Sequence, residues 1–117
     1  MKPSVFLVCL LSVLFFYGCM NMPTRASQIT GSYVSPAEYA GYTCDRLIAE
    51  IASLSRRESQ LTIAQEQRYK TSEMQAFWWG FGGGDGIEAS ELAHIKGRKE
   101  AVLTVISINK CEQGFTK

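Results

Sequence analysis

The 117-residue sequence is short of the residues that catalytic and metal sites usually require. It has a single histidine, His94, and four cysteines that form no Cys-x-x-C pair. A structural zinc site takes four Cys or His ligands at close spacings, and a thioredoxin-like redox site takes Cys-x-x-C. Gly-x-Ser-x-Gly is also absent. We therefore expect no metal, no cofactor and no enzyme activity, and we interpret His94 as a solvated or edge histidine.

An excess of charge of one sign is lacking as well. The chain carries 12 Lys and Arg against 11 Asp and Glu. Its basic groups, Arg56-Arg57 and Lys96 to Lys99, have Glu58 and Glu100 beside them. A nucleic-acid-binding domain presents a basic face, so the balance argues against a nucleic-acid partner. No small-molecule substrate is indicated either.

Only one long hydrophobic run is present, Val5 to Tyr17, after the basic start Met1-Lys2. A membrane span needs about 20 apolar residues, and polar residues follow this run at once. The pattern is typical of a secretory signal and predicts a signal peptide over residues 1–18. A permanent anchor helix is the alternative.

The end of this run resembles a bacterial lipoprotein signal, in which a small residue precedes the cysteine that receives lipid. Gly18-Cys19 fits that pattern, although Phe16 and Tyr17 stand where smaller or aliphatic residues are usual. The resemblance implies acylation (palmitate) at Cys19, and Met20 in place of aspartate implies an outer-membrane, periplasm-facing location. Ordinary cleavage after Ala26 is the alternative.

A count of the cysteines then leaves two that can form a disulfide. Cys9 leaves with the signal and Cys19 is alkylated, so Cys44 and Cys111 are the two thiols left. An even pair in an oxidising compartment normally forms a disulfide. It closes a loop of nearly seventy residues, worth about 4 kcal/mol in the chain-entropy model. A thiol-active redox pair is the alternative.

Residues 19–34 are small and polar and include Pro23 and Gly31. This composition is typical of a linker. We expect a flexible tether over 19–34 and a folded domain over 35–117.

Two helix starts follow the tether. Ser35 before Pro36 resembles an N-cap with proline at the first helical position. Thr43 then caps a longer helix that has Asp45 in its first turn, where a carboxylate favours the helix dipole. Steps of three, four and seven place the next apolar residues on one stripe, which predicts a helix over about 44–70. The stripe consists of Leu47, Ile48, Ile51, Leu54, Leu61, Ile63 and Tyr69.

Glu58 and Gln65 interrupt this stripe where a tight seam would have leucine. Either the packing there is imperfect or the helix changes its partner. A second helix is predicted over about 85–111, although the β-branched residues 101–108 leave a strand as the alternative. Gly97 inside this helix costs about 1 kcal/mol against alanine, which a close helix–helix approach or a kink would explain.

The two predicted helices and the cysteine pair together predict an all-α fold. It is an antiparallel, coiled-coil-like two-helix hairpin that is closed by a Cys44–Cys111 disulfide. Matched helices of 44–70 and 85–111 would each be roughly 40 Å long at 1.5 Å per residue. Residues 71–84 form the tip at the end opposite the disulfide. With lipid expected at one end and the tip at the other, the hairpin would suit a protein that bridges two surfaces.

The tip combines aromatics with glycines. Its glycines favour a turn, with Asp85 as the next helix cap, rather than a phosphate loop, because no Lys-Ser/Thr follows them. The four aromatic residues either plug the end of a thin core or form an exposed surface that docks on a membrane interface or a protein. These residues are Phe77, Trp78, Trp79 and Phe81.

Nearly the whole mature chain resembles a group of small proteobacterial lipoproteins with no established biochemical activity. The relatives have a longer apolar tip where this chain has Gly82–Gly84, which speaks against insertion of the tip into lipid. The resemblance implies an envelope lipoprotein and adds no reaction. The shared positions are Tyr39, Tyr42, Thr43, Cys44, Asp45 and Leu47, then Gly84 to Gly86, Glu91 to Gly97, and Asn109 to Cys111.

We therefore expect a lipid-anchored envelope protein with a structural or protein-interaction role and an unidentified envelope partner. The alternative is a phage- or plasmid-type exclusion lipoprotein that blocks a receptor or a transfer channel.

Overall fold

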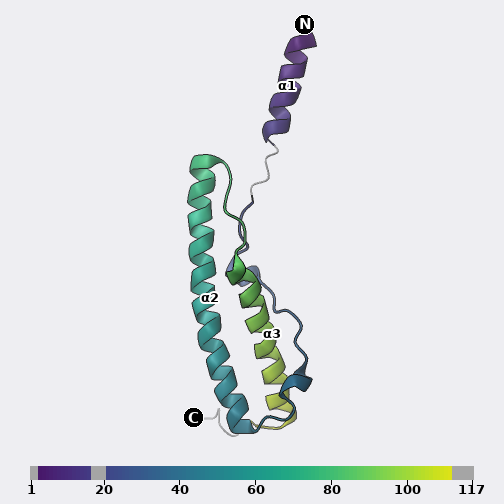
Figure 1. Cartoon of the computed structure of the whole chain (residues 1–117), viewed down its shortest axis with the longest axis vertical. Coiled ribbons are helices and arrows are strands. Elements are labelled where there is room, and N and C mark those ends of the chain that lie inside the picture. The colour runs from purple at the N-terminus through teal and green to yellow at the C-terminus, as the bar shows by residue number, and fades with distance from the viewer. Residues whose placement is uncertain (1–2, 17–20, 112–117) are drawn as a thin grey trace.

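The computed structural model describes residues 3–16 and 21–111, and within these ranges every regular element is helical. The predicted lipidation site, Cys19, lies outside the described residues. Residues 101–108 are helical, so the strand alternative is wrong. The elements in chain order are α1 (Pro3–Phe16), the short 3₁₀ turns η1 (Ala26–Gln28) and η2 (Pro36–Tyr39), α2 (Cys44–Trp79) and α3 (Ile87–Ile108) (Figure 1).

The apolar run near the start of the chain forms α1. Among the residues described, no helix has both the length and the apolar character that crossing a membrane requires.

The long helix α2 begins where the sequence indicates. The Thr43 hydroxyl accepts a hydrogen bond from the backbone N–H of Arg46, and Asp45 lies in the first turn. The helix ends at Gly80, whose φ of 79° is left-handed and whose N–H donates to the carbonyl of Ala76. The predicted end near residue 70 is therefore too early by nine residues. Nothing between 71 and 79 breaks a helix, and Gly80 is the first residue that adopts the left-handed cap at no steric cost.

The second helix is shorter than its partner. α3 has 22 residues against 36 in α2, so the predicted hairpin of matched helices is wrong in length. Residues 80–86 do not turn within a few residues but run back beside the end of α2 before α3 begins (Figure 1). Along this return the N–H of Gly83 donates to the Ser72 hydroxyl at 3.3 Å. The last three turns of α2 thus extend beyond α3.

The seam between α2 and α3 contains the apolar core and confirms the predicted helical hairpin. Cys44 and Cys111 are bonded at the closed end, with their Cα atoms 5.5 Å apart. Ion pairs such as Arg98–Glu50 and Lys99–Glu58 flank the seam. The buried side chains of the seam are Leu47, Ile51, Leu54, Leu61, Leu92, Ile95, Ala101, Val102, Val105 and Ile106.

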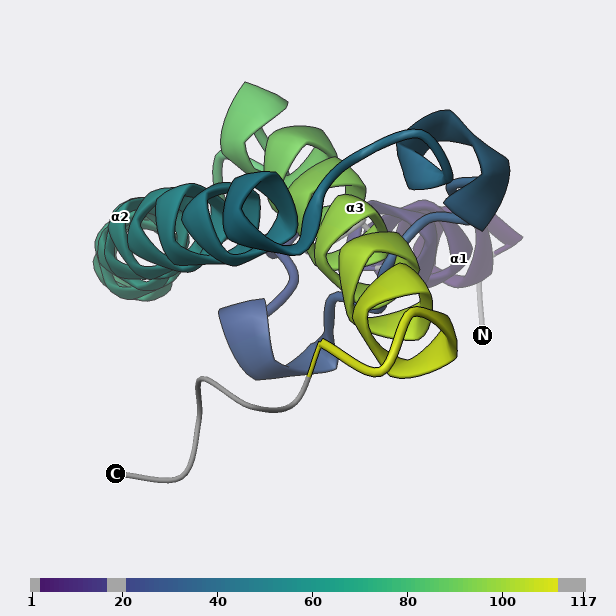
Figure 2. The same ribbon diagram turned by 90° about the horizontal axis from the view of Figure 1, so that it is seen from below.

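Residues 21–34 pack on the hairpin instead of forming the free tether that their composition predicts. Ala26 is only 2% exposed. The Lys96 ammonium donates to the carbonyls of Ala26 and Ile29 at 2.9 and 2.7 Å, and the Ser32 N–H donates to the carbonyl of Ala93 at 2.9 Å. Viewed along the hairpin, η1 lies beside the line along which α2 and α3 meet, and η2 lies on the side of α3 that faces away from α2 (Figure 2). The tether prediction is wrong because small polar residues also suit close backbone packing.

Gly97 is the position that permits this packing. A Cβ atom added to it would overlap the carbonyl oxygen of Ser32, and a Cβ added to Gly31 would lie 3.0 Å from the backbone nitrogen of Gly97. The glycine therefore accommodates an extended chain segment. It serves neither a helix–helix contact nor a kink.

The segment ends at the disulfide end of the hairpin. The Ser35 hydroxyl accepts the N–H of Ala37 and caps η2, as predicted. Tyr39 is buried, and its hydroxyl accepts a hydrogen bond from Arg98 Nε at 2.8 Å. The guanidinium of Arg46 stacks on the Tyr42 ring at 3.8 Å. The chain from residue 21 to residue 43 is thus a third layer that runs the length of α3.

Candidate functional site at the aromatic end of the hairpin

The end of the hairpin that carries Phe77, Trp78 and Trp79 begins where α2 gains new packing partners. Gln65 is fully buried, and its side-chain amide donates to the carbonyl of Thr24 at 2.7 Å and to the carboxylate of Asp85 at 2.9 Å. The part of α2 before Gln65 packs on α3. After Gln65, α2 keeps one ion pair to the start of α3, between Arg68 and Glu88, and otherwise contacts residues 22–24 and 80–86. Gln65 therefore marks a change of partner, which was one of the two interpretations of its place in the stripe.

Asp85 holds the N-terminal segment at this end through hydrogen bonds. Its carboxylate accepts the N–H and the hydroxyl of Thr24, both at 2.6 Å, as well as the amide of Gln65. Desolvation raises the pKa of Asp85, but the hydrogen bonds from Thr24 and Gln65 and the charge of Arg68 outweigh it, so the pKa lies below the ordinary value of an aspartate. The predicted cap role is wrong: Gly86 is the cap residue of α3 and supplies no side-chain hydrogen bond.

The glycines let two extended segments approach each other. The N–H of Gly84 donates to the carbonyl of Asn21 at 2.9 Å, and Gly84 has a φ of 67°. A Cβ at Gly82 would lie 2.9 Å from the Met22 sulfur and 3.0 Å from the Asn21 carbonyl oxygen. Glycine at both positions is required by this contact, because a side chain would displace the N-terminal segment.

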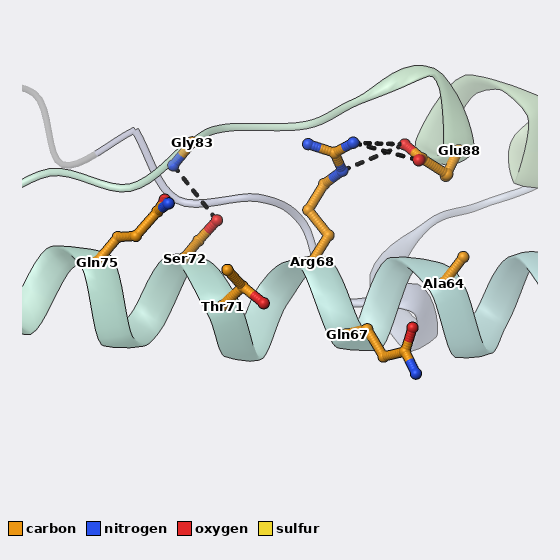
Figure 3. Close-up of a pocket in the computed structure, with 8 residues that line it drawn as sticks. All are labelled: Ala64, Gln67, Arg68, Thr71, Ser72, Gln75, Gly83 and Glu88. Carbon is orange, nitrogen blue, oxygen red and sulfur yellow. Dashed lines mark hydrogen bonds and ion pairs between the residues drawn. The ribbon is translucent and has the colours of Figure 1, made fainter.

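A polar groove lies beside this contact (Figure 3). The Arg68 guanidinium donates to both carboxylate oxygens of Glu88 at 3.2 Å, and these bonds hold the pKa of Glu88 below its ordinary value. The pair leaves the groove without net charge, which favours a structural role for it over capture of an ionic ligand. Its lining residues are Ala64, Gln67, Arg68, Thr71, Ser72, Gln75, Gly83 and Glu88.

The four predicted tip aromatics lie together at the end of α2, and all are exposed. Phe77 is 81% exposed, Trp78 71%, Trp79 75% and Phe81 63%. Phe77 and Trp78 contact each other edge to face, with ring centroids 5.4 Å apart. Residues this exposed fill no core, so the plug interpretation is wrong. We call Met74, Phe77, Trp78, Trp79 and Phe81 the aromatic end; Met74 is 65% exposed.

Sequence reasoning missed the residues that brace this end from the N-terminal side. Met22 lines a shallow cavity together with Tyr69, Glu73, Ala76 and Phe77. The Arg25 guanidinium lies 4.5 Å from the centre of the Tyr69 ring. No signal in a short polar segment distinguishes these contacts from a free linker. The arrangement becomes visible only in the tertiary structure.

The other predicted site residues lie elsewhere. The Cys44–Cys111 disulfide is at the opposite end of the hairpin, and His94 is exposed on α3. Within residues 3–16 and 21–111, no group of three His, Cys, Asp or Glu side chains could hold a metal ion.

Comparison with protein-family models, curated proteins and solved structures found no match for this chain.

Proposed function

We propose that the mature chain is a lipid-anchored lipoprotein of the bacterial envelope with a structural or protein-interaction role in the periplasm. The proposal rests first on the export signal over residues 1–18 and on Gly18-Cys19, which resembles a lipidation site. Met20 after the cysteine supports delivery to the outer membrane.

The observation that carries the proposal is the disulfide between Cys44 and Cys111. Structural disulfides form and persist in oxidising compartments and are rare in a reducing cytosol. A disulfide that joins the two ends of the hairpin therefore agrees with export across the inner membrane. The disulfide holds the two helices together at one end of an elongated hairpin, in which α2 alone is about 54 Å long at 1.5 Å per residue.

The arrangement of the polar side chains favours a binding role over a catalytic one. Charged side chains of α2 pair across the seam with those of α3, as in Arg57–Glu91 and Arg98–Glu50. The carboxylate of Asp85 is taken up by Thr24 and Gln65. The side chains of the aromatic end, in contrast, are largely exposed to solvent in the described structure. An exposed group of large aromatic residues is typical of a surface that contacts a protein or a membrane interface.

Mass spectrometry of the mature N-terminal peptide tests the proposal. Protein from bacterial cells should begin at Cys19 and carry diacylglyceryl and acyl chains, and palmitate labelling should disappear in Cys19→Ser. The control Cys9→Ser should keep the label, because Cys9 lies within the predicted signal peptide. A mature chain that begins at Ser27 without lipid would contradict the proposal.

Photo-crosslinking in intact envelopes tests the interaction role. Ile63 is an apolar residue of α2 that is 60% exposed, so a crosslinker placed there detects a protein that binds along the side of the hairpin. We expect a discrete adduct with an envelope protein. Arg56, which is exposed on the same helix about two turns earlier, is the second position tested. Absence of protein adducts at these and at further exposed positions along both helices would count against an interaction role.

A further inference from the structure

The mature N-terminus enters the fold at the aromatic end. Asn21 contacts Gly82 and Gly84, which follow the last turn of α2. Cys19 precedes Asn21 by two residues, and an extended chain spans at most about 3.6 Å per residue, so the lipid attachment point is within roughly 7 Å of Asn21. The expectation of lipid and aromatics at opposite ends is therefore wrong. A lipid at Cys19 would share the end that carries the aromatics, because residues 21–34 fold back along the hairpin.

The level of this entry along α2 is fixed by a second contact. Met22 shares a shallow cavity with Ala76 and Phe77, and its sulfur lies close to where a Gly82 side chain would be. Ala76 precedes Trp79 by less than one turn of helix. The N-terminal segment thus reaches the same turns of α2 that carry the aromatic side chains.

We propose that the aromatic end inserts into the interfacial layer of the same membrane leaflet that holds the acyl chains of Cys19. The inference rests on the proposed lipidation and goes beyond it, because it assigns a second membrane anchor and an orientation. The hairpin then stands on the bilayer with the Cys44–Cys111 end directed into the periplasm.

The angular spread of the aromatics favours a membrane over a protein partner. Phe77, Trp78 and Trp79 are consecutive in the last turn of α2, and successive residues of a helix are about 100° apart around its axis. The three side chains therefore cover roughly 200° and form no single stripe. A partner helix beside α2 would bury only one side of this arrangement. A fluid surface that meets the helix end-on contacts all three.

The chemistry of the aromatic end also fits the interfacial layer. Tryptophan is enriched at membrane–water interfaces because its large apolar ring carries one polar N–H. Residues 74–84 contain no ionisable side chain, and the nearest charges before them on α2 are Lys70 and Glu73. Docking should therefore depend on apolar burial and require neither anionic lipid nor low salt.

The glycines that seemed to argue against insertion have a different role. Gly82 and Gly84 admit Asn21 and Met22 against the end of α2. Apolar bulk is not needed at these positions, because the side chains that face solvent come from the last turns of α2 and from Phe81. Replacing the glycines with large apolar residues would displace the N-terminal segment.

Intrinsic fluorescence provides a direct test, because Trp78 and Trp79 are the only two tryptophans in the chain. Acylated protein purified from cells is reconstituted into phosphatidylcholine vesicles, with and without bromine on the acyl chains near the glycerol. We expect blue-shifted emission in plain vesicles and loss of most of the intensity in brominated vesicles. Added salt should leave both results unchanged.

A reporter at the other end provides the matched control. In Trp78→Phe/Trp79→Phe/Ile108→Trp, the single tryptophan replaces Ile108, which is 69% exposed at the end of α3 beside the disulfide. This variant keeps the lipid anchor at Cys19 and keeps aromatic rings at positions 78 and 79. Its emission should be that of tryptophan in water and should not be quenched by brominated lipid.

Three results would overturn the inference in distinguishable ways. If the protein is acylated and bound to vesicles while Trp78 and Trp79 stay unquenched by bromine and open to acrylamide, the aromatic end is free for a protein partner and the proposed function stands. If the Ile108→Trp reporter is quenched as strongly, the hairpin lies flat. If mass spectrometry finds no lipid and the protein does not sediment with vesicles, the proposed function fails as well.

Discussion

Replacing Gly97 with alanine tests the packing of the N-terminal segment, on which the position of the lipid depends. If residues 21–34 were a free tether, the substitution would stabilise α3 by about 1 kcal/mol, because alanine is the better helix former. In the structure, however, the added methyl group would overlap the carbonyl oxygen of Ser32. The two arrangements therefore predict opposite signs.

The magnitude follows from what must move. Overpacking of a tight contact typically costs about 1–3 kcal/mol. Displacing Ser32 also strains its hydrogen bond to Ala93 and the two bonds that Lys96 donates to Ala26 and Ile29. The gain of about 1 kcal/mol in helix propensity is offset by the strain in these hydrogen bonds, each worth about 1 kcal/mol, so we expect a net destabilisation of about 1–3 kcal/mol. For a domain of this size the melting temperature changes by about 4–8 °C per kcal/mol.

Thermal unfolding followed by circular dichroism, under non-reducing conditions, measures the effect. Gly41→Ala is the matched control, because nothing lies within 4 Å of a Cβ at that position and its φ is not left-handed. This control should be neutral or slightly stabilising. Gly31→Ala, whose Cβ would lie 3.0 Å from the Gly97 backbone nitrogen, should destabilise in the same direction as Gly97→Ala.

A melting temperature of Gly97→Ala equal to or above that of the parent would refute the reasoning. The N-terminal segment would then be free of α3 in solution, and the lipid would no longer be held at the aromatic end. Destabilisation of Gly41→Ala by the same amount would likewise show that the effect is not specific to the Ser32 contact.

Three further predictions follow from the same structure. The pKa of Asp85 is lowered in the folded state, so the hydrogen bonds to its carboxylate stabilise the fold at pH values above the ordinary pKa of an aspartate, and this contribution is lost as the pH falls through the folded pKa. Because Asp85 is exposed to solvent, Asp85→Asn should be less stable near neutral pH by less than about 1 kcal/mol and should equal the parent in acid, as chemical denaturation at several pH values will show. Cys44→Ala/Cys111→Ala should be about 4 kcal/mol less stable in the same assay, because the disulfide closes a loop of 67 residues. Trp79→Ala should change stability by no more than about 0.5 kcal/mol, since Trp79 is 75% exposed, and a large loss would show that it packs in the core after all.

Parts of the aromatic end were visible in the sequence, and parts were not. The aromatic residues themselves were identified, as was the irregular place of Gln65 in the stripe. The partners of Gln65 were not, because Thr24 and Asp85 are 41 and 20 residues away along the chain. Helical periodicity relates neighbours within a few turns, and it carries no information on which distant segment meets a polar break.

The extent of α2 illustrates the same limit in a different way. The equal-length hairpin assumed that the two cysteines set the register and that the glycine-rich stretch is a short turn. The sequence between 71 and 79 is compatible with helix throughout, and only Gly80 ends it. Whether such a stretch is helix or loop depends on what covers it, and the covering segments come from residues 21–24 and 80–86.

The sequence by itself determined the helical class, the Thr43 cap and the pairing of Cys44 with Cys111, because these depend on local periodicity, local hydrogen bonds and a count of thiols. Only the tertiary structure decided that residues 21–34 return along α3 and bring the N-terminus to the aromatic end. That choice depends on backbone contacts at Gly97, Gly82 and Gly84, where an absent side chain matters only once the approaching chain segment is known.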